Sequence, residues 1–234
     1  QRAVALAVFF GFIWGFGNLT YGMANRYLGI ALGGSVAIAF CMVFGTLIPP
    51  IHDGTASKLL YSTSGRVIFG GVLLCTFGIA LCGLAGRRRE VELAGAKTDP
   101  DTERFSLATG LFVAVLAGIL SACFSFGLSA GKPIAEISVQ RNTDPLFSNN
   151  VVLIAVLTGG FLSNALCCLV MNFTTRTFGD YARVDKHYLP NVLLAWISGV
   201  TWFCQFFFYG MGQAKLGKQF DFSSWSIHMA FIVV

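Results

Sequence analysis

Charged residues are scarce in this sequence of 234 residues. Asp, Glu, Lys and Arg together make up 12% of the chain, whereas a soluble domain carries about 25%. Motifs of common enzymes are missing as well, because the sequence has no HExxH or Walker A pattern. These absences predict that the chain is not an enzyme and has no catalytic residues.

The seven cysteines give no sign of a disulfide framework or of a metal site. All of them fall inside apolar segments, and their spacing does not match paired metal ligands. Charge-free segments also lack the carboxylates that would complete a metal site. We therefore expect no metal and no cofactor, and interpret the cysteines as small packing residues.

Long apolar runs are what the sequence has in abundance, and its mean hydropathy is +0.70. Six runs contain no charged residue and are long enough, at about 20 residues, to cross a hydrocarbon core of ~30 Å as helices. They cover residues 3–25, 27–51, 67–86, 105–131, 145–175 and 188–214, and a shorter seventh run covers 222–234. The pattern predicts an all-α membrane protein, a polytopic bundle of six full helices plus part of a seventh in a lipid bilayer.

The only long polar stretch divides the chain into two parts. It begins with an arginine triplet at 87–89, directly after the third run. We expect a charged loop over 87–106 between two membrane regions, 1–86 and 107–234. The triplet is interpreted as a topology anchor, not as a nucleic-acid site, and the positive-inside rule places this loop in the cytoplasm.

Two segments of the chain repeat one another at an offset of 188 positions. WGFGNLTYGM begins at Trp14 and WFCQFFFYGM begins at Trp202, and the motif that starts at Tyr21 recurs at Tyr209. The two segments belong to helices five spans apart, so they should cross the membrane in opposite directions. This is typical of an inverted repeat of two five-helix halves, with a substrate site near the midplane between them.

Both repeated segments place aromatic rings and an amide on one helix face. The faces consist of Trp14, Asn18 and Tyr21 in the first run and of Trp202, Gln205, Phe206 and Tyr209 in the sixth. Such a face suits a neutral polyhydroxylated ligand, because C–H groups stack on rings while hydroxyls bond to the amide and the phenol. The alternative is that the rings form interfacial belts and the amides join helices.

The seventh run places ionisable groups on one face. Asp221, Ser224, Trp225 and His228 follow one another at helical spacing. His228 titrates near neutral pH, so His228 with Asp221 is the first candidate for a proton carrier. The alternatives are an N-cap for Asp221 and a neutral ring that bonds to a neighbouring helix for His228.

The connection between the fourth and fifth runs holds a second polar cluster. Lys132 and Pro133 are expected to end the fourth helix, and Asp144 with Pro145 to begin the fifth. Glu136 lies one turn beyond Lys132 and is placed to pair with it. Glu136 is also the third candidate for proton coupling.

Long ordered stretches resemble the L-rhamnose–proton symporters of the drug/metabolite transporter superfamily. They are WGFGNLTYGMANRYLG, SVAIAFCMVFGTLIPPI, GILSACFSFGLSAGKPIAE with TDPL, the W-x-x-Q-F-F-F-Y-G-M-G motif, and DFSSWSIHM. The resemblance implies uptake of L-rhamnose with a proton across the bacterial inner membrane. It also implies ten helices, of which this chain would hold the third to the ninth, and it includes the Lys132-Pro133 and Asp144-Pro145 motifs.

The sequence therefore predicts a transporter that imports a neutral deoxy sugar, L-rhamnose, driven by the proton gradient. The predicted sugar-binding residues are Trp14, Asn18, Tyr21, Trp202, Gln205, Tyr209 and Trp225. The predicted proton-coupling residues are Asp221, His228 and Glu136. Two alternatives remain open, a metabolite or drug transporter of the same superfamily and a non-transporting sugar sensor, and the sequence does not determine the oligomeric state.

Overall fold

The computed structural model describes residues 1–52, 54, 57, 61–94, 107–182, 187–216 and 221–232, and every regular element within these ranges is helical. The α-helices are α1 (Arg2–Leu28), α2 (Ile30–His52), α4 (Thr63–Ala94), α5 (Leu107–Ala130), α6 (Lys132–Gln140), α7 (Ser148–Thr175), α8 (Tyr188–Leu216) and α9 (Asp221–Ile232). Two short 3₁₀ helices, η1 (Pro145–Phe147) and η2 (Phe178–Ala182), precede and follow α7. The predicted all-α fold is confirmed.

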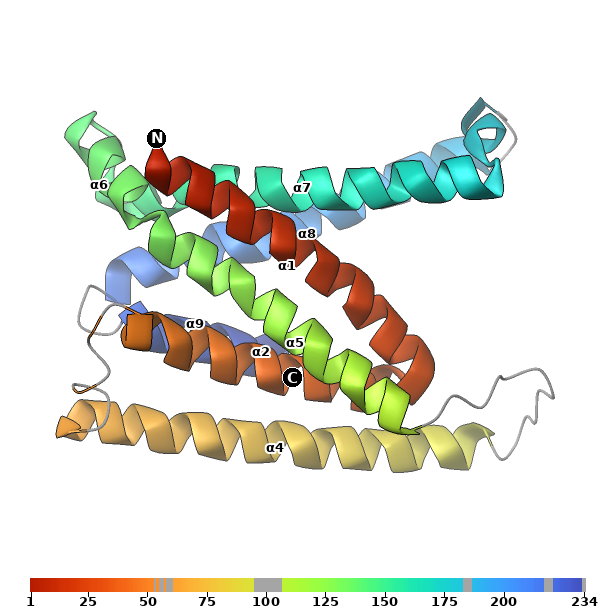
Figure 1. Ribbon diagram of the computed structural model, residues 1–234, viewed down its shortest axis with the longest axis horizontal. Helices are drawn as coiled ribbons and strands as arrows, with labels where there is room; N and C mark the ends of the chain where they lie inside the picture. The colour runs from red at the N-terminus through yellow and green to blue at the C-terminus, as the bar shows by residue number, and fades with distance from the viewer. Residues whose placement is uncertain are drawn as a thin grey trace.

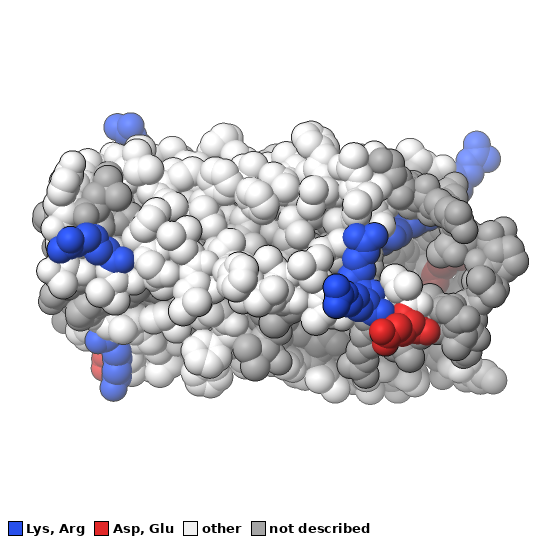
Figure 2. Space-filling view, turned by 90° about the horizontal axis from the view of Figure 1, so that it is seen from below, with Lys and Arg blue, Asp and Glu red and all other residues white. Residues whose placement is uncertain are grey.

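Six segments within the described residues are long and apolar enough to cross a membrane. They are Arg2–Leu28, Ile30–His52, Gly65–Ala85, Leu107–Gln140, Pro145–Thr175 and Tyr188–Leu216. Charged side chains on the face shown in Figure 2 lie in two zones, separated by a broad uncharged band. Such a band is what a hydrocarbon core of ~30 Å requires of the surface it covers. The chain is thus a multi-pass membrane protein.

Helices α1 and α5 form the centre of the bundle. They run diagonally across the molecule, with α7 and α8 on one side and α2, α9 and α4 on the other (Figure 1). Helix α1 packs mainly against α5 and α7, whereas α2 packs against α5, α4 and α9. Segments from the first and last thirds of the chain therefore meet around α5.

Glycines bring α1 and α7 into close contact. A Cβ atom added at Gly15 would lie 2.9 Å from the carbonyl oxygen of Gly160, and one added at Gly159 would lie 2.6 Å from the backbone nitrogen of Phe12. In a bilayer, helices gain little from hydrophobic burial against each other, so close backbone approach and dispersion stabilise their contact. These glycines therefore set the distance between α1 and α7.

Helix α4 is longer than the charge-free run that predicted it. It begins at Thr63 and continues beyond position 86 through the arginine triplet to Ala94. The expected loop start at 87 is therefore wrong, because Arg, Glu, Leu and Ala are strong helix formers and continue the helix outside the apolar core. The rest of the expected loop, 95–106, lies outside the described residues.

The end of the fourth span also differs from the expectation. Helix α5 ends at Ala130, and Lys132 and Pro133 open the new helix α6 instead of ending the old one. Proline is tolerated in a first turn, where its missing N–H has no intrahelical acceptor to lose. Asp144 caps η1 instead of the spanning helix α7: its carboxylate accepts a 2.8 Å hydrogen bond from Leu146 N, whereas the N-cap position of α7 is Phe147.

Candidate functional site

The two tryptophans of the repeated segments meet in the middle of the bundle. The rings of Trp14 on α1 and Trp202 on α8 are stacked, with centroids 5.9 Å apart and an angle of 12° between planes. Trp14 is 6% exposed, whereas Trp202 is 44% exposed. One indole is thus buried in the core, while nearly half of the other is exposed.

Further rings extend this pair into one group, called here the aromatic cluster. Its members are Trp14, Phe124, Trp202, Phe206, Tyr209, Trp225 and His228, contributed by α1, α5, α8 and α9. The rings of Phe124 and Phe206 are 4.6 Å apart and lie between the two halves of the group. Phe124 is fully buried and contacts both Trp14 and Trp225. The cluster therefore connects helices that are far apart in the sequence.

Among the described residues, three hydrogen bonds join α9 to its neighbours. The hydroxyls of Thr46 on α2 and Ser226 are 2.7 Å apart, and the other two involve members of the aromatic cluster. Trp225 Nε1 donates to the carbonyl oxygen of Cys41 on α2 at 3.1 Å, and the hydroxyls of Tyr209 and Ser224 are 3.1 Å apart. Trp225 is 4% exposed, so its indole packs inside the bundle. These bonds hold the α9 side of the aromatic cluster in a defined geometry.

His228 lies among the aromatic rings. Its imidazole centroid is 4.7 Å from Tyr209, 5.7 Å from Phe206 and 5.8 Å from Trp225. Its Nε2 atom is buried and has no hydrogen-bond partner among the described residues. The hydrogen-bonding capacity of this nitrogen is therefore not used by the described residues.

The other predicted sugar-binding residues lie on the two helices that carry Trp14 and Trp202. Gln205 is half-buried on α8, and Asn18 is exposed on α1, one turn beyond Trp14. The Tyr21 hydroxyl lies at α2, 2.9 Å from the position that a Cβ of Gly34 would take. Tyr21 on α1 thus reaches α2, the next helix in the chain. In the same way, Tyr209 on α8 reaches α9, the next helix in the chain.

The remaining predicted residues lie at one end of the molecule. Glu136, Lys132 and Pro133 are exposed on α6, and Asp144 and Pro145 are exposed in the segment that leads into α7. Asp221 is the first residue of α9, but its side chain lies outside the described part of the chain. His228 is consequently the one proton-coupling candidate that the structure places in the aromatic cluster.

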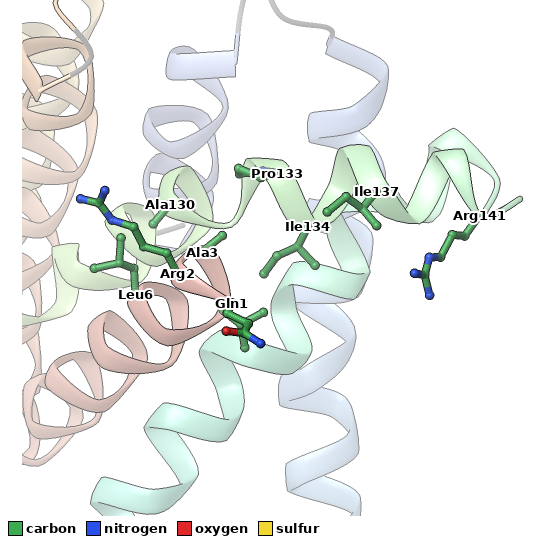
Figure 3. A pocket seen from close by; sticks show the side chains of 10 residues that line it. Gln1, Arg2, Ala3, Leu6, Ala130, Pro133, Ile134, Ile137 and Arg141 are labelled. Carbon is green, nitrogen blue, oxygen red and sulfur yellow. The ribbon is translucent and has the colours of Figure 1, made fainter.

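An open groove of about 660 Å³ lies between α6 and the start of α1. Figure 3 shows Ile134 between Arg2 and Arg141, which lie at opposite sides of the groove. Most other lining residues are aliphatic, including Leu6 and Ile137. Such walls offer few partners for the hydroxyls of a sugar, so the aromatic cluster is the better candidate site.

Phe124 is a member of the cluster that the sequence did not single out, whereas Phe206 belongs to the face predicted for Trp202, Gln205 and Tyr209. Both lie in apolar runs with many phenylalanines, 23 in the whole chain. A run that is apolar on all sides gives no periodic contrast between faces. Phe206 was indicated by its spacing of four residues after Trp202, which places both rings on one helix face.

Comparisons with known proteins cover the whole chain. Residues 2–234 match a family model described as L-rhamnose-proton symport protein. L-rhamnose-proton symporters of Citrobacter koseri and Salmonella newport are each 35% identical to this chain, over 228 and 230 residues; each comparison covers 96% of the chain and 65% of the relative. The symporter of Klebsiella pneumoniae is 35% identical over 238 residues, covering the full chain and 68% of the relative.

The chain thus spans about two thirds of the length of these relatives. No solved structure matches it. The family consists of proton-coupled sugar transporters and not of enzymes. Because the family model matches residues 2–234 and the relatives are 35% identical over 96–100% of the chain, this chain belongs to the L-rhamnose-proton symport protein family.

Proposed function

We propose that the protein imports L-rhamnose together with a proton across the bacterial inner membrane by alternating access. The observation that carries this proposal is the stacked pair of Trp14 and Trp202, at 5.9 Å. These residues come from equivalent positions of the two repeated segments and meet inside a multi-pass membrane protein of a sugar symporter family. An inverted repeat places its substrate site where the two halves meet.

The sugar ring binds to the open surface of Trp202. Its C–H groups stack on the indole, and its hydroxyls bond to polar groups at the edge of the aromatic cluster, such as Tyr209 and Gln205. Trp14 supports the indole from behind and is itself too buried to form the outer surface. Asn18 and Tyr21 complete the wall that α1 contributes.

Proton coupling is assigned to His228, with Asp221 and Glu136 as further carriers. Protonation at Nε2 would place a cation within 6 Å of three aromatic rings, and such faces attract cations. Because Tyr209 contacts His228 and belongs to the predicted sugar site, both ligands act on the same segment of α8. Proton and sugar would thus each bias the same conformational equilibrium.

The two alternatives are less well supported. The whole-chain family match does not favour a drug exporter or a non-transporting sensor. A cationic drug also needs an acidic group near the site, and the cluster consists of aromatic rings and an imidazole.

Transport by the purified protein in liposomes tests the proposal. With an imposed pH gradient, acidic outside, radiolabelled L-rhamnose should accumulate above its external concentration. Without the gradient, the protein should only exchange labelled for unlabelled sugar across the membrane. Failure of both accumulation and exchange would reject transport of this sugar, while gradient-independent accumulation would reject proton coupling.

A further inference from the structure

Buried polar atoms without a partner are concentrated beside the aromatic cluster. Among the described residues, four buried side-chain nitrogen or oxygen atoms have no hydrogen-bond partner. Two of them are the Oδ1 and Nδ2 atoms of Asn150 on α7, and a third is Nε2 of His228. Buried polar groups are normally paired, so each exception requires an explanation.

The amide of Asn150 faces the same side of α8 as the ring of Phe206. A Cβ added at Gly210 would lie 3.2 Å from Cγ of Asn150 and closer still to its Oδ1, so the absent side chain makes room for the amide. Gly210 is four residues after Phe206, one helical turn of about 5.4 Å along the same face. Phe206 itself contacts Trp202 and His228. Asn150 thus lies at the edge of the aromatic cluster.

A packing role does not account for this amide. Asn164, on the same helix, donates to the carbonyl oxygen of Gly160 at 2.8 Å, which shows how an amide in α7 can be satisfied locally. Asn150 has no such bond among the described residues. The close approach of an amide to a glycine occurs in only one of the two repeated segments. Gly22 takes the position of Gly210 in the first segment, and a Cβ added there would have no atom within 4 Å.

An unpaired amide next to a sugar site has the right chemistry to bind a sugar. One amide can donate from Nδ2 and accept at Oδ1 at the same time, so it can bond to two neighbouring hydroxyls of one ring. A neutral amide also suits a neutral ligand, since no charge is left unbalanced.

We infer that Asn150 is a sugar-binding residue that hydrogen-bonds two neighbouring hydroxyls of L-rhamnose at the edge of the aromatic cluster. The inference rests on the proposed function. It makes Asn150 a residue for specificity, because a site built to bond hydroxyls discriminates strongly against analogues that lack them. It also explains why a membrane helix carries an amide whose partner is absent when no sugar is bound.

The test replaces Asn150 by Leu, which has a similar volume and no hydrogen-bonding group. Removal of an unpaired buried amide should leave the melting temperature of the sugar-free protein unchanged or higher. The affinity for L-rhamnose, measured by binding of the labelled sugar, should fall on the order of 10- to 100-fold. The control Asn149→Leu changes the neighbouring amide, which is not among the unpaired buried groups, and should bind the sugar as the wild type does.

Monodeoxy analogues of L-rhamnose make the test specific. Two analogues that lack adjacent hydroxyls should bind the wild type more weakly than L-rhamnose, and this penalty should disappear in Asn150→Leu. An unchanged affinity of the variant, or a lower melting temperature without loss of discrimination, would overturn the role of Asn150 while leaving the proposed function intact. If the wild type itself binds no L-rhamnose, the proposed function fails, and this inference fails with it.

Discussion

Replacing Trp202 by Ala should remove most of the sugar affinity while the protein still folds. Trp202 stacks on Trp14 and contacts Phe206 at 4.9 Å, yet it is 44% exposed. Its removal therefore deletes the proposed sugar platform and leaves the buried part of the cluster in place. Trp14→Ala is the opposite case, because Trp14 is 6% exposed and its loss would open a cavity in the core.

The two variants differ in the free energies they should lose. Truncation of a buried Trp costs about 3–5 kcal/mol of folding free energy, so Trp14→Ala should reduce the amount of folded protein. For Trp202 the folding cost is smaller, because nearly half of the side chain is already exposed. An aromatic hot spot in a binding site contributes about 2 kcal/mol or more, which corresponds to a rise in Kd of roughly 30-fold.

Binding of labelled L-rhamnose to purified protein, with a thermal melt of each sample, measures both effects. Trp202→Phe keeps an aromatic face and should recover most of the affinity. Trp196→Ala is the matched control, since this tryptophan is on the same helix and is 67% exposed. A Trp202→Ala variant that binds the sugar as tightly as Trp196→Ala does would refute the platform.

Three further changes test other parts of the structure. His228→Gln keeps hydrogen-bonding groups but cannot titrate near neutral pH. Sugar exchange should therefore persist, while accumulation driven by a pH gradient should be lost. Normal accumulation in response to the gradient would rule out His228 as the proton carrier. Gly15→Leu should separate α1 from α7, so the peak of folded protein in gel filtration in detergent should be lost. Gly22→Leu is the control, because the space around Gly22 is open and this peak should remain. Equal yields of folded protein from the two variants would contradict the close contact. Trp225→Phe loses the hydrogen bond from Nε1 to the carbonyl oxygen of Cys41, and a thermal melt should show a loss of about 1 kcal/mol of stability. The sugar affinity should change little, because the Trp225 ring is buried. A large loss of affinity would instead place Trp225 in the sugar site.

The charge pattern of the sequence was sufficient to locate the spans. A charged side chain inside a bilayer is costly, so runs without charge and spanning helices coincide. The offset between Trp14 and Trp202 correctly singled out two residues that meet in space. Sequence could not show that one of them is buried and the other open, because that difference depends on how α5 and α7 pack around α1.

Local signals failed where a residue type is compatible with two structures. Pro133 can end a helix or begin one, and only the break before Lys132 decides between them. The arginines at 87–89 anchor the topology equally well in a loop or in a helix. Phe124 and Asn150 became visible through contacts with other helices, since their own helices are apolar on most sides and give no contrast between faces.

The most direct test of the account is an experimental structure of the protein with L-rhamnose bound. Density for the sugar ring is expected against the exposed face of Trp202, with the ring of Trp14 behind the indole and with hydroxyls towards Tyr209, Gln205 and Asn150. A sugar bound instead in the aliphatic groove between α6 and the start of α1, with the tryptophan pair unliganded, would contradict the central claim.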